Sequence, residues 1–159
     1  MKKFLSMMLF ALPLLALTAC HDEDDLPDVD FNFTIENATR ADGYLYIVQG
    51  ETMEITSIEV VNKDSGKPAL ITAANFYWDY YYIGSAIEPP YAFSIETGED
   101  TPLGDHILQV ESPLYAEGKT AATSVVTFRV RVVADASDIP TGGEQSFVVH
   151  PRTSTTAEK

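Results

Sequence analysis

The chain has 159 residues, of which 24 are Asp or Glu and only 10 are Lys or Arg, so its formal net charge at pH 7 is -14. This length fits one domain of ordinary size. The absence of a basic cluster excludes recognition of nucleic acid through its phosphates and electrostatic binding to anionic lipid. Aromatic residues make up 11% of the chain, which is enough for a hydrophobic core and excludes a fully disordered protein.

The first 19 residues have the pattern of a signal peptide. Lys2 and Lys3 precede an almost uninterrupted apolar stretch over residues 4–17. A helix needs about 20 apolar residues to cross a bilayer, so this stretch is too short for a membrane span. Its flanks are those of an export signal. We therefore expect residues 1–19 to be removed during export.

Cys20 is the only cysteine of the chain, so it has no partner for an intramolecular disulfide. A catalytic thiolate needs an ordered histidine or a cation beside it, and no pattern around His21 would order that residue. The sequence Leu17-Thr18-Ala19-Cys20 resembles the lipobox of bacterial lipoproteins. The resemblance implies cleavage before Cys20 and attachment of lipid to its thiol. The alternative is an ordinary signal peptide followed by a free thiol.

An acidic segment begins directly after this cysteine. It consists of His21, Asp22, Glu23, Asp24 and Asp25. The segment resembles the export signal of Bacteroidetes-type outer-membrane lipoproteins, which implies a protein anchored in the outer membrane and exposed on the cell surface. More than one acyl chain gives stable attachment. Lipid on Cys20 would therefore suffice as the anchor, and the folded domain would not itself contact the membrane. The alternative is a solvated linker, and in both cases we expect residues 20–30 to be an acidic, flexible spacer.

Between residues 31 and 134, segments rich in β-branched and aromatic residues are separated by turns. The candidate strands are residues 31–35, 44–48, 53–61, 76–83, 91–95, 106–110 and 127–132. No window outside the signal peptide has a sustained helical period. About seven short strands predict an all-β protein, an antiparallel β-sandwich of the immunoglobulin type. We expect residues 135–159 to be a C-terminal extension with a short strand at 147–149 and disorder from Thr153 onward.

The strand candidate at residues 53–61 changes its apolar parity. Met53 and Ile55 would share one face, whereas Ile58 and Val60 would lie on the other. A shift by one residue predicts a β-bulge or a strand that changes partners.

Three blocks of the central region resemble bacterial immunoglobulin-like modules. They are Asn75–Gly84, Pro90–Ser94 and Gly104–Val110. The resemblance covers roughly residues 55–132 and implies that Phe76 and Trp78 face the core, with Trp78 as the buried aromatic residue of the third strand of the immunoglobulin frame. Tyr80 stands where these modules carry a turn glycine after Asp79, which leaves the tightness of this hairpin open.

Four tyrosines of this hairpin are the candidate binding residues: Tyr77, Tyr80, Tyr81 and Tyr82. Exposed tyrosines form flat amphipathic surfaces that stack on sugar rings or pack against a protein. The candidate partners are therefore a glycan or a surface protein. The alternative is that these tyrosines are ordinary strand residues that cover the sheet.

The sequence predicts neither a catalytic site nor a cofactor. It lacks the G-x-S-x-G and H-E-x-x-H motifs and a glycine-rich phosphate loop. His106 is predicted to be a structural residue of a core strand, and no His or Cys lies at the spacing of a metal site. The acids in residues 22–30 and 99–105 could gather Ca²⁺, but neither stretch has the ligand spacing of a known loop, so we expect solvated acid.

We therefore expect a non-catalytic cell-surface lipoprotein with one immunoglobulin-like domain, and two functions remain open. The first is glycan binding in support of nutrient uptake, through the tyrosine hairpin. The second is a structural or adhesion role in a surface assembly, as a pilus-like or partner-docking protein that contributes a strand edge or a sandwich face.

Overall fold

The computed structural model describes residues 25–63 and 66–155. The predicted signal peptide, Cys20 and residues 21–24 of the acidic segment lie outside the described residues. Within them the chain is almost entirely β, with a short 3-10 turn at Ala136–Asp138.

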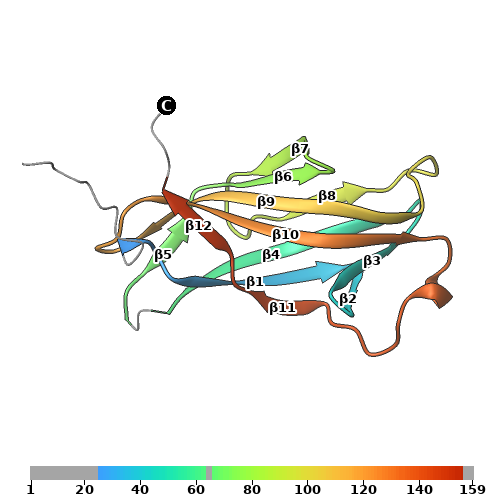
Figure 1. Ribbon diagram of the computed structural model, residues 1–159, viewed down its shortest axis with the longest axis horizontal. Helices are drawn as coiled ribbons and strands as arrows, with labels where there is room; N and C mark the ends of the chain where they lie inside the picture. The colour runs from blue at the N-terminus through green and yellow to red at the C-terminus, as the bar shows by residue number, and fades with distance from the viewer. Residues whose placement is uncertain (1–24, 64–65, 156–159) are drawn as a thin grey trace, which may run out of the picture.

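The strands form two sheets (Figure 1). Sheet A has the order β11-β1-β4-β8, with β1 at Val29–Glu36, β4 at Thr52–Asn62, β8 at Phe93–Glu96 and β11 at Ser146–Val149. Sheet B has the order β2-β3-β10-β9-β6-β7, with β2 at Thr39–Ala41, β3 at Tyr44–Val48, β6 at Ala74–Trp78, β7 at Tyr81–Ala86, β9 at Gly104–Ala116 and β10 at Ala122–Val133. Two further strands of sheet B, β5 at Ala69–Ile71 and β12 at Arg152–Thr155, pair with β9 and β10 respectively.

Seven of these strands make an immunoglobulin-like frame. β1, β4 and β8 form one layer, and β10, β9, β6 and β7 form the other, which is the A-B-E and G-F-C-C′ arrangement of such sandwiches. β3 adds to this frame by running parallel to β10. The predicted fold class is confirmed, and the remaining short strands extend its sheets.

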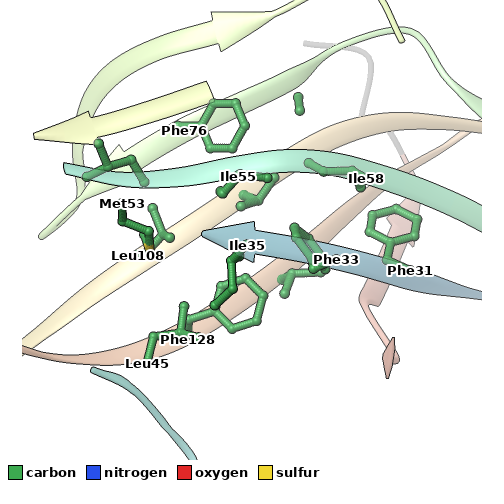
Figure 2. Packing of buried hydrophobic residues seen from close by; sticks show 14 of the residues in the cluster. Phe31, Phe33, Ile35, Leu45, Met53, Ile55, Ile58, Phe76, Leu108 and Phe128 are labelled. Carbon is green, nitrogen blue, oxygen red and sulfur yellow. The ribbon is translucent and has the colours of Figure 1, made fainter. Parts of the chain in front are cut away.

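The core lies between the two layers, where alternate residues of each strand point inward. The largest fully buried side chains are Val29, Phe31, Phe33, Ile35, Leu45, Ile47, Met53, Ile55, Ile71, Phe76, Leu108 and Leu114. Figure 2 shows many of them gathered between the strands. Phe33 of sheet A meets Phe128 of sheet B edge-on, with ring centroids 5.1 Å apart, so aromatic contacts join the layers directly.

The predicted bulge is present in β4. Thr34 of β1 pairs with Ser57, but the next residue, Ile35, pairs with Ile55, so Thr56 is the extra residue. The bulge turns Met53, Ile55 and Ile58 to the same buried side despite their spacing. The parity change in the sequence is therefore absorbed by one unpaired residue.

The ends of the domain differ from the predicted boundaries. Asp25 is already attached to the sandwich, because its carbonyl accepts a hydrogen bond from the Thr120 N–H at 3.0 Å, and β1 begins at Val29 inside the predicted spacer. At the other end, β11 pairs with β1, and β12 pairs with β10 where disorder from Thr153 was expected. The physical reason is that β11 and β12 complete sheet edges through backbone hydrogen bonds. A polar sequence can supply such bonds as well as an apolar one.

Candidate functional site

The hairpin between β6 and β7 has a tight two-residue turn. Trp78 pairs with Tyr81, and the two residues between them, Asp79 and Tyr80, have φ values of 48° and 71°. Positive φ at both central positions is the type I′ geometry that matches the twist of a hairpin. The turn thus stays tight without the glycine that the family resemblance leads one to expect.

Tyr80 adopts this turn at an energetic cost. A left-handed backbone costs a side-chain-bearing residue about 1–2 kcal/mol, and Tyr80 is 73% exposed, so it gains little packing in return. The hairpin between β2 and β3 has the same backbone signs at Asp42 and Gly43, with φ values of 50° and 81°. There glycine holds the second position without that cost.

Asp79 fixes the turn to the body of the sandwich. Its Oδ1 accepts a hydrogen bond from the Ile107 N–H at 2.9 Å, and its Oδ2 lies 2.7 Å from Nδ1 of His106. The other ring nitrogen of His106 lies 2.8 Å from the carbonyl oxygen of Pro102. The ring of Trp78 stacks on the imidazole, with centroids 5.1 Å apart. This network connects the hairpin to β9 and to the loop before it.

His106 is a buried structural residue, as predicted. Both of its ring nitrogens face acceptors, so both are satisfied only when each carries a proton. Burial acts to lower the pKa of His106, but the hydrogen bonds to Asp79 and to the Pro102 carbonyl outweigh it and raise the pKa above its ordinary value. The charged imidazolium is therefore the form that the fold favours.

The four candidate tyrosines do not form one surface. Tyr77 and Tyr82 are cross-strand partners on the outer face of sheet B, with ring centroids 5.6 Å apart. Burial, followed by the charge of Glu111, raises the pKa of Tyr77. Tyr81 pairs instead with Trp78, and Tyr80 lies at the tip. Tyr81 and Tyr82 are divided because successive residues of a strand point to opposite faces of the sheet.

A groove lies where the two sheets end side by side. β8 is the last strand of sheet A and β7 the last of sheet B, and the space between them has a volume of about 440 Å³. It is lined by Trp78, Tyr81, Ile83, Phe93, Ser94, Ile95, Glu96 and Thr101. We call it the edge groove. Its volume lies within the range of roughly 300–1,000 Å³ typical of ligand pockets.

Phe93 and Gly84 shape this groove, although sequence reasoning assigned neither of them a role in the site. The Phe93 ring stacks on Phe76 with centroids 4.2 Å apart and planes 7° apart. A Cβ on Gly84 would lie 2.6 Å from the Phe93 ring, so the absence of a side chain there lets the ring approach β7. No local pattern signals this contact, because it depends on which strands end the two sheets.

Trp78 is less buried than expected. Phe76 is the fully buried aromatic residue of β6, whereas Trp78 is only partly buried and borders the groove. Phe76 faces the core and Trp78 packs against it, as expected, but Trp78 is not the fully buried aromatic residue of this strand. The physical reason is that Trp78 lies beside the hairpin turn, where the open space between β7 and β8 leaves part of its ring uncovered.

Some acidic residues of the domain face cations. Lys63 Nζ lies 3.4 Å from Oδ1 of both Asp28 and Asp30. Arg131 hydrogen-bonds Asp105 at 2.7 Å and holds the pKa of that carboxyl below its ordinary value. Over residues 25–63 and 66–155, no group of three or more His, Cys, Asp or Glu side chains is placed to hold a metal ion. The same residues include no helix long and apolar enough to cross a membrane.

No known protein-family model matches the chain, and no curated protein matches it. Among solved structures, it is similar to the fibronectin(III)-like modules of CbhA from Clostridium thermocellum. The two share 21% identity over an alignment that covers 62% of this chain and 94% of that chain, with a TM-score of 0.38.

Proposed function

We propose that this chain is a lipid-anchored surface protein whose sandwich is a non-catalytic glycan-binding module, with the edge groove as its binding site. The observation that carries the proposal is the combination of aromatic and small polar groups in one groove. Trp78 and Tyr81 offer ring faces, while Ser94, Glu96 and Thr101 lie along the same lining. Sugar rings present apolar faces and hydroxyl edges, so both kinds of group are matched.

The exposure of the hairpin supports this proposal. Tyr81 is 77% exposed, so core packing does not account for its presence. Tyr80 beside it is held in a left-handed conformation that costs free energy, and such strain is found mostly where function requires it. The Asp79 hydrogen bonds hold both tyrosines on a fixed turn, which limits the entropy lost on binding.

One observation favours the second function, a structural or adhesion role. β7 and β8 each end a sheet, so each has one edge without a neighbouring strand among the described residues. Free edges of this kind accept a strand from another protein. A partner that adds a strand would cover the same groove, so a direct binding experiment has to separate the two functions.

Tyr81→Ala is expected to weaken glycan binding about tenfold or more, because it removes an exposed ring from the groove at little cost in stability. Tyr82→Ala is the matched control. It removes the adjacent tyrosine, 60% exposed, from the outer face of sheet B and should change the affinity less than twofold. The measurement is titration of the purified full chain, in mild detergent, with glycans that an array identifies.

Equal losses in the two variants would contradict the assignment of the groove. A loss confined to Tyr82→Ala would move the site to the outer face of sheet B. Absence of glycan binding together with a protein that co-purifies stoichiometrically and is released by Tyr81→Ala would favour the strand-docking function.

The anchor is tested separately by mass spectrometry of the mature N-terminus. We expect the exported chain to begin at Cys20 with a diacylglycerol on the thiol, since stable attachment needs more than one acyl chain. Cys20→Ser should release the protein from the membrane fraction. A mature chain that begins elsewhere, or carries no lipid, would overturn the lipoprotein assignment and leave the binding site unaffected.

A further inference from the structure

We infer that the edge groove selects uncharged glycans and rejects acidic ones such as uronates, sialosides and sulfated sugars. This inference rests on the proposed glycan-binding function and concerns the same groove. Two observations carry it: the distribution of charged residues around β7 and β8, and the hydrogen-bonding groups that line the groove.

The part of the chain that builds the groove contains no Lys or Arg, and its one histidine, His106, lies behind Trp78 and is paired with Asp79. No Lys or Arg occurs between Lys67 and Lys119, a stretch that includes β6, β7, β8 and the loops at both ends of the groove. The same stretch carries eight acids: Asp79, Glu88, Glu96, Glu99, Asp100, Asp105, Glu111 and Glu117. The nearby cations Arg129 and Arg131 belong to β10 and approach Asp105. They are engaged on the far side of β9 from the groove, since Asp105 is an outward residue of that strand.

The acids cluster where a ligand would enter. Glu96 lines the groove itself. Glu99 and Asp100 follow in the loop that leads to Thr101, another lining residue. Glu88 is exposed in the loop that joins β7 to β8 at the other end. A ligand carboxylate or sulfate would therefore meet like charge at both ends of the groove, with no fixed cation among the lining residues.

Hydrogen bonding leads to the same selection. A carboxylate such as Glu96 can only accept hydrogen bonds, and a sugar hydroxyl can donate one to it, which makes a charge-assisted bond. An ionised uronate or sulfate has no proton to donate at that position. Replacing a hydroxyl by an acid group thus loses a hydrogen bond and adds repulsion, so both contributions disfavour the acidic ligand.

The experiment compares each glycan with its own charged derivative. The purified full chain is screened against an array of neutral and acidic oligosaccharides. Every neutral one that binds is oxidised at C6, which converts its hydroxymethyl group into a carboxylate. We expect the oxidised form to bind at least tenfold more weakly near 0.15 M salt. The ratio should grow at 0.01 M salt, because the screening length increases from about 8 Å to about 30 Å.

Glu96→Gln tests the residue that lines the groove. It should weaken binding of the neutral glycan, because the charge-assisted hydrogen bond is lost. It should weaken binding of the oxidised form less, so the affinity ratio between the two forms should narrow at low salt. Glu117→Gln is the matched control, because Glu117 lies beyond the far end of β9, nine residues from Leu108, which pairs with the groove residue Trp78. At the usual rise per residue this separation is about 30 Å. Glu117→Gln removes the same charge and should leave the affinity ratio between the neutral and the oxidised glycan unchanged.

Each outcome bears on one claim. Binding of acidic glycans as tight as that of neutral ones, or an equal effect of Glu96→Gln and Glu117→Gln, would overturn the charge selection and leave the glycan-binding function standing. If no glycan of either kind binds, the proposed function itself fails. The inference is supported if C6 oxidation weakens binding, Glu96→Gln narrows the affinity ratio between the two forms, and Glu117→Gln leaves that ratio unchanged.

Discussion

Replacing Phe147 by alanine is expected to lower the free energy of unfolding by about 3 kcal/mol. Phe147 lies in β11, is only 5% exposed, and packs with ring centroids 6.1 Å from Phe33 and 5.8 Å from Phe128. The guanidinium of Arg40 lies 4.8 Å from the ring centroid on the solvent side. Truncation would open a cavity bordered by strands of both sheets, which cannot collapse without moving them.

Val148→Ala is the matched control for this prediction. Val148 is the next residue of the same strand, is 57% exposed and lies on the opposite face. It should change the free energy of unfolding by less than about 0.5 kcal/mol. Urea unfolding of both variants, followed by tryptophan fluorescence, provides the comparison. Similar small losses in both would mean that the segment after Ala134 is not part of the folded core.

The strands of the sandwich could be read from the sequence because their patterning is local. Alternation of apolar and polar residues over residues 31–35 and 127–132 has the period of a strand with one buried face, and both segments are strands. The bulge in β4 was also visible, as a change of parity. These features need no knowledge of which strands are neighbours.

The sheet edges could not be read in the same way. β12 has the sequence Arg-Thr-Ser-Thr, which carries no apolar period, and it is held in place by backbone pairing with Ala122–Val125 of β10. The edge position becomes clear only when the sheet order is known. The same limit explains why disorder was expected where β12 forms.

The candidate site was predicted in composition but not in geometry. The tyrosine-rich hairpin was identifiable from residues 77–82, but the pairing set by the two-residue turn and the order of the strands decide that Tyr82 faces outward beside Tyr77 and that Tyr81 lines the groove. The opposite wall comes from β8, which is distant in sheet order and adjacent only because both strands end their sheets. A groove between two edges is a property of the topology, and no single segment encodes it.

Asp79→Ala is expected to lower the free energy of unfolding by about 3 kcal/mol at pH 6. The substitution removes the acceptor for the Ile107 N–H and the partner of the buried His106 ring. Hydrogen bonds to charged groups contribute about 1.5–3 kcal/mol each, and a buried donor left without a partner adds its own cost. Alanine also tolerates the positive φ of this position less well than aspartate does.

In Asp79→Ala the free energy of unfolding should also lose the pH dependence that the wild type shows above pH 6.5. In the wild type the pKa of His106 is raised in the folded state, so the folded protein binds a proton more tightly than the unfolded chain, whose histidine titrates near 6.5. The resulting stabilisation is fully present below pH 6.5 and is lost as the pH rises through the folded-state pKa. Without Asp79, the strongest contribution that raises this pKa disappears, and the decline should flatten.

Asp79→Asn separates the turn from the ion pair. Asparagine accepts positive φ and keeps a carbonyl oxygen for the Ile107 N–H, so it should restore about half of the lost stability. It lacks the charge that favours imidazolium, so the pH dependence should remain flat. Urea unfolding between pH 6 and pH 9 measures both effects, and His150→Gln removes the other histidine of the described chain as a control. An unchanged slope in Asp79→Ala would contradict the assignment.

The same substitutions connect stability to binding. Asp79 holds the turn that carries Tyr80 and Tyr81, and Trp78 stacks on the His106 ring at the border of the groove. Loosening this network should weaken glycan binding in Asp79→Ala even under conditions where the protein stays folded, because the ring of Tyr81 must then be ordered when the ligand binds. Asp79→Asn keeps the turn and should bind nearly as tightly as the wild type, so the two variants distinguish a positioned groove from a merely exposed tyrosine.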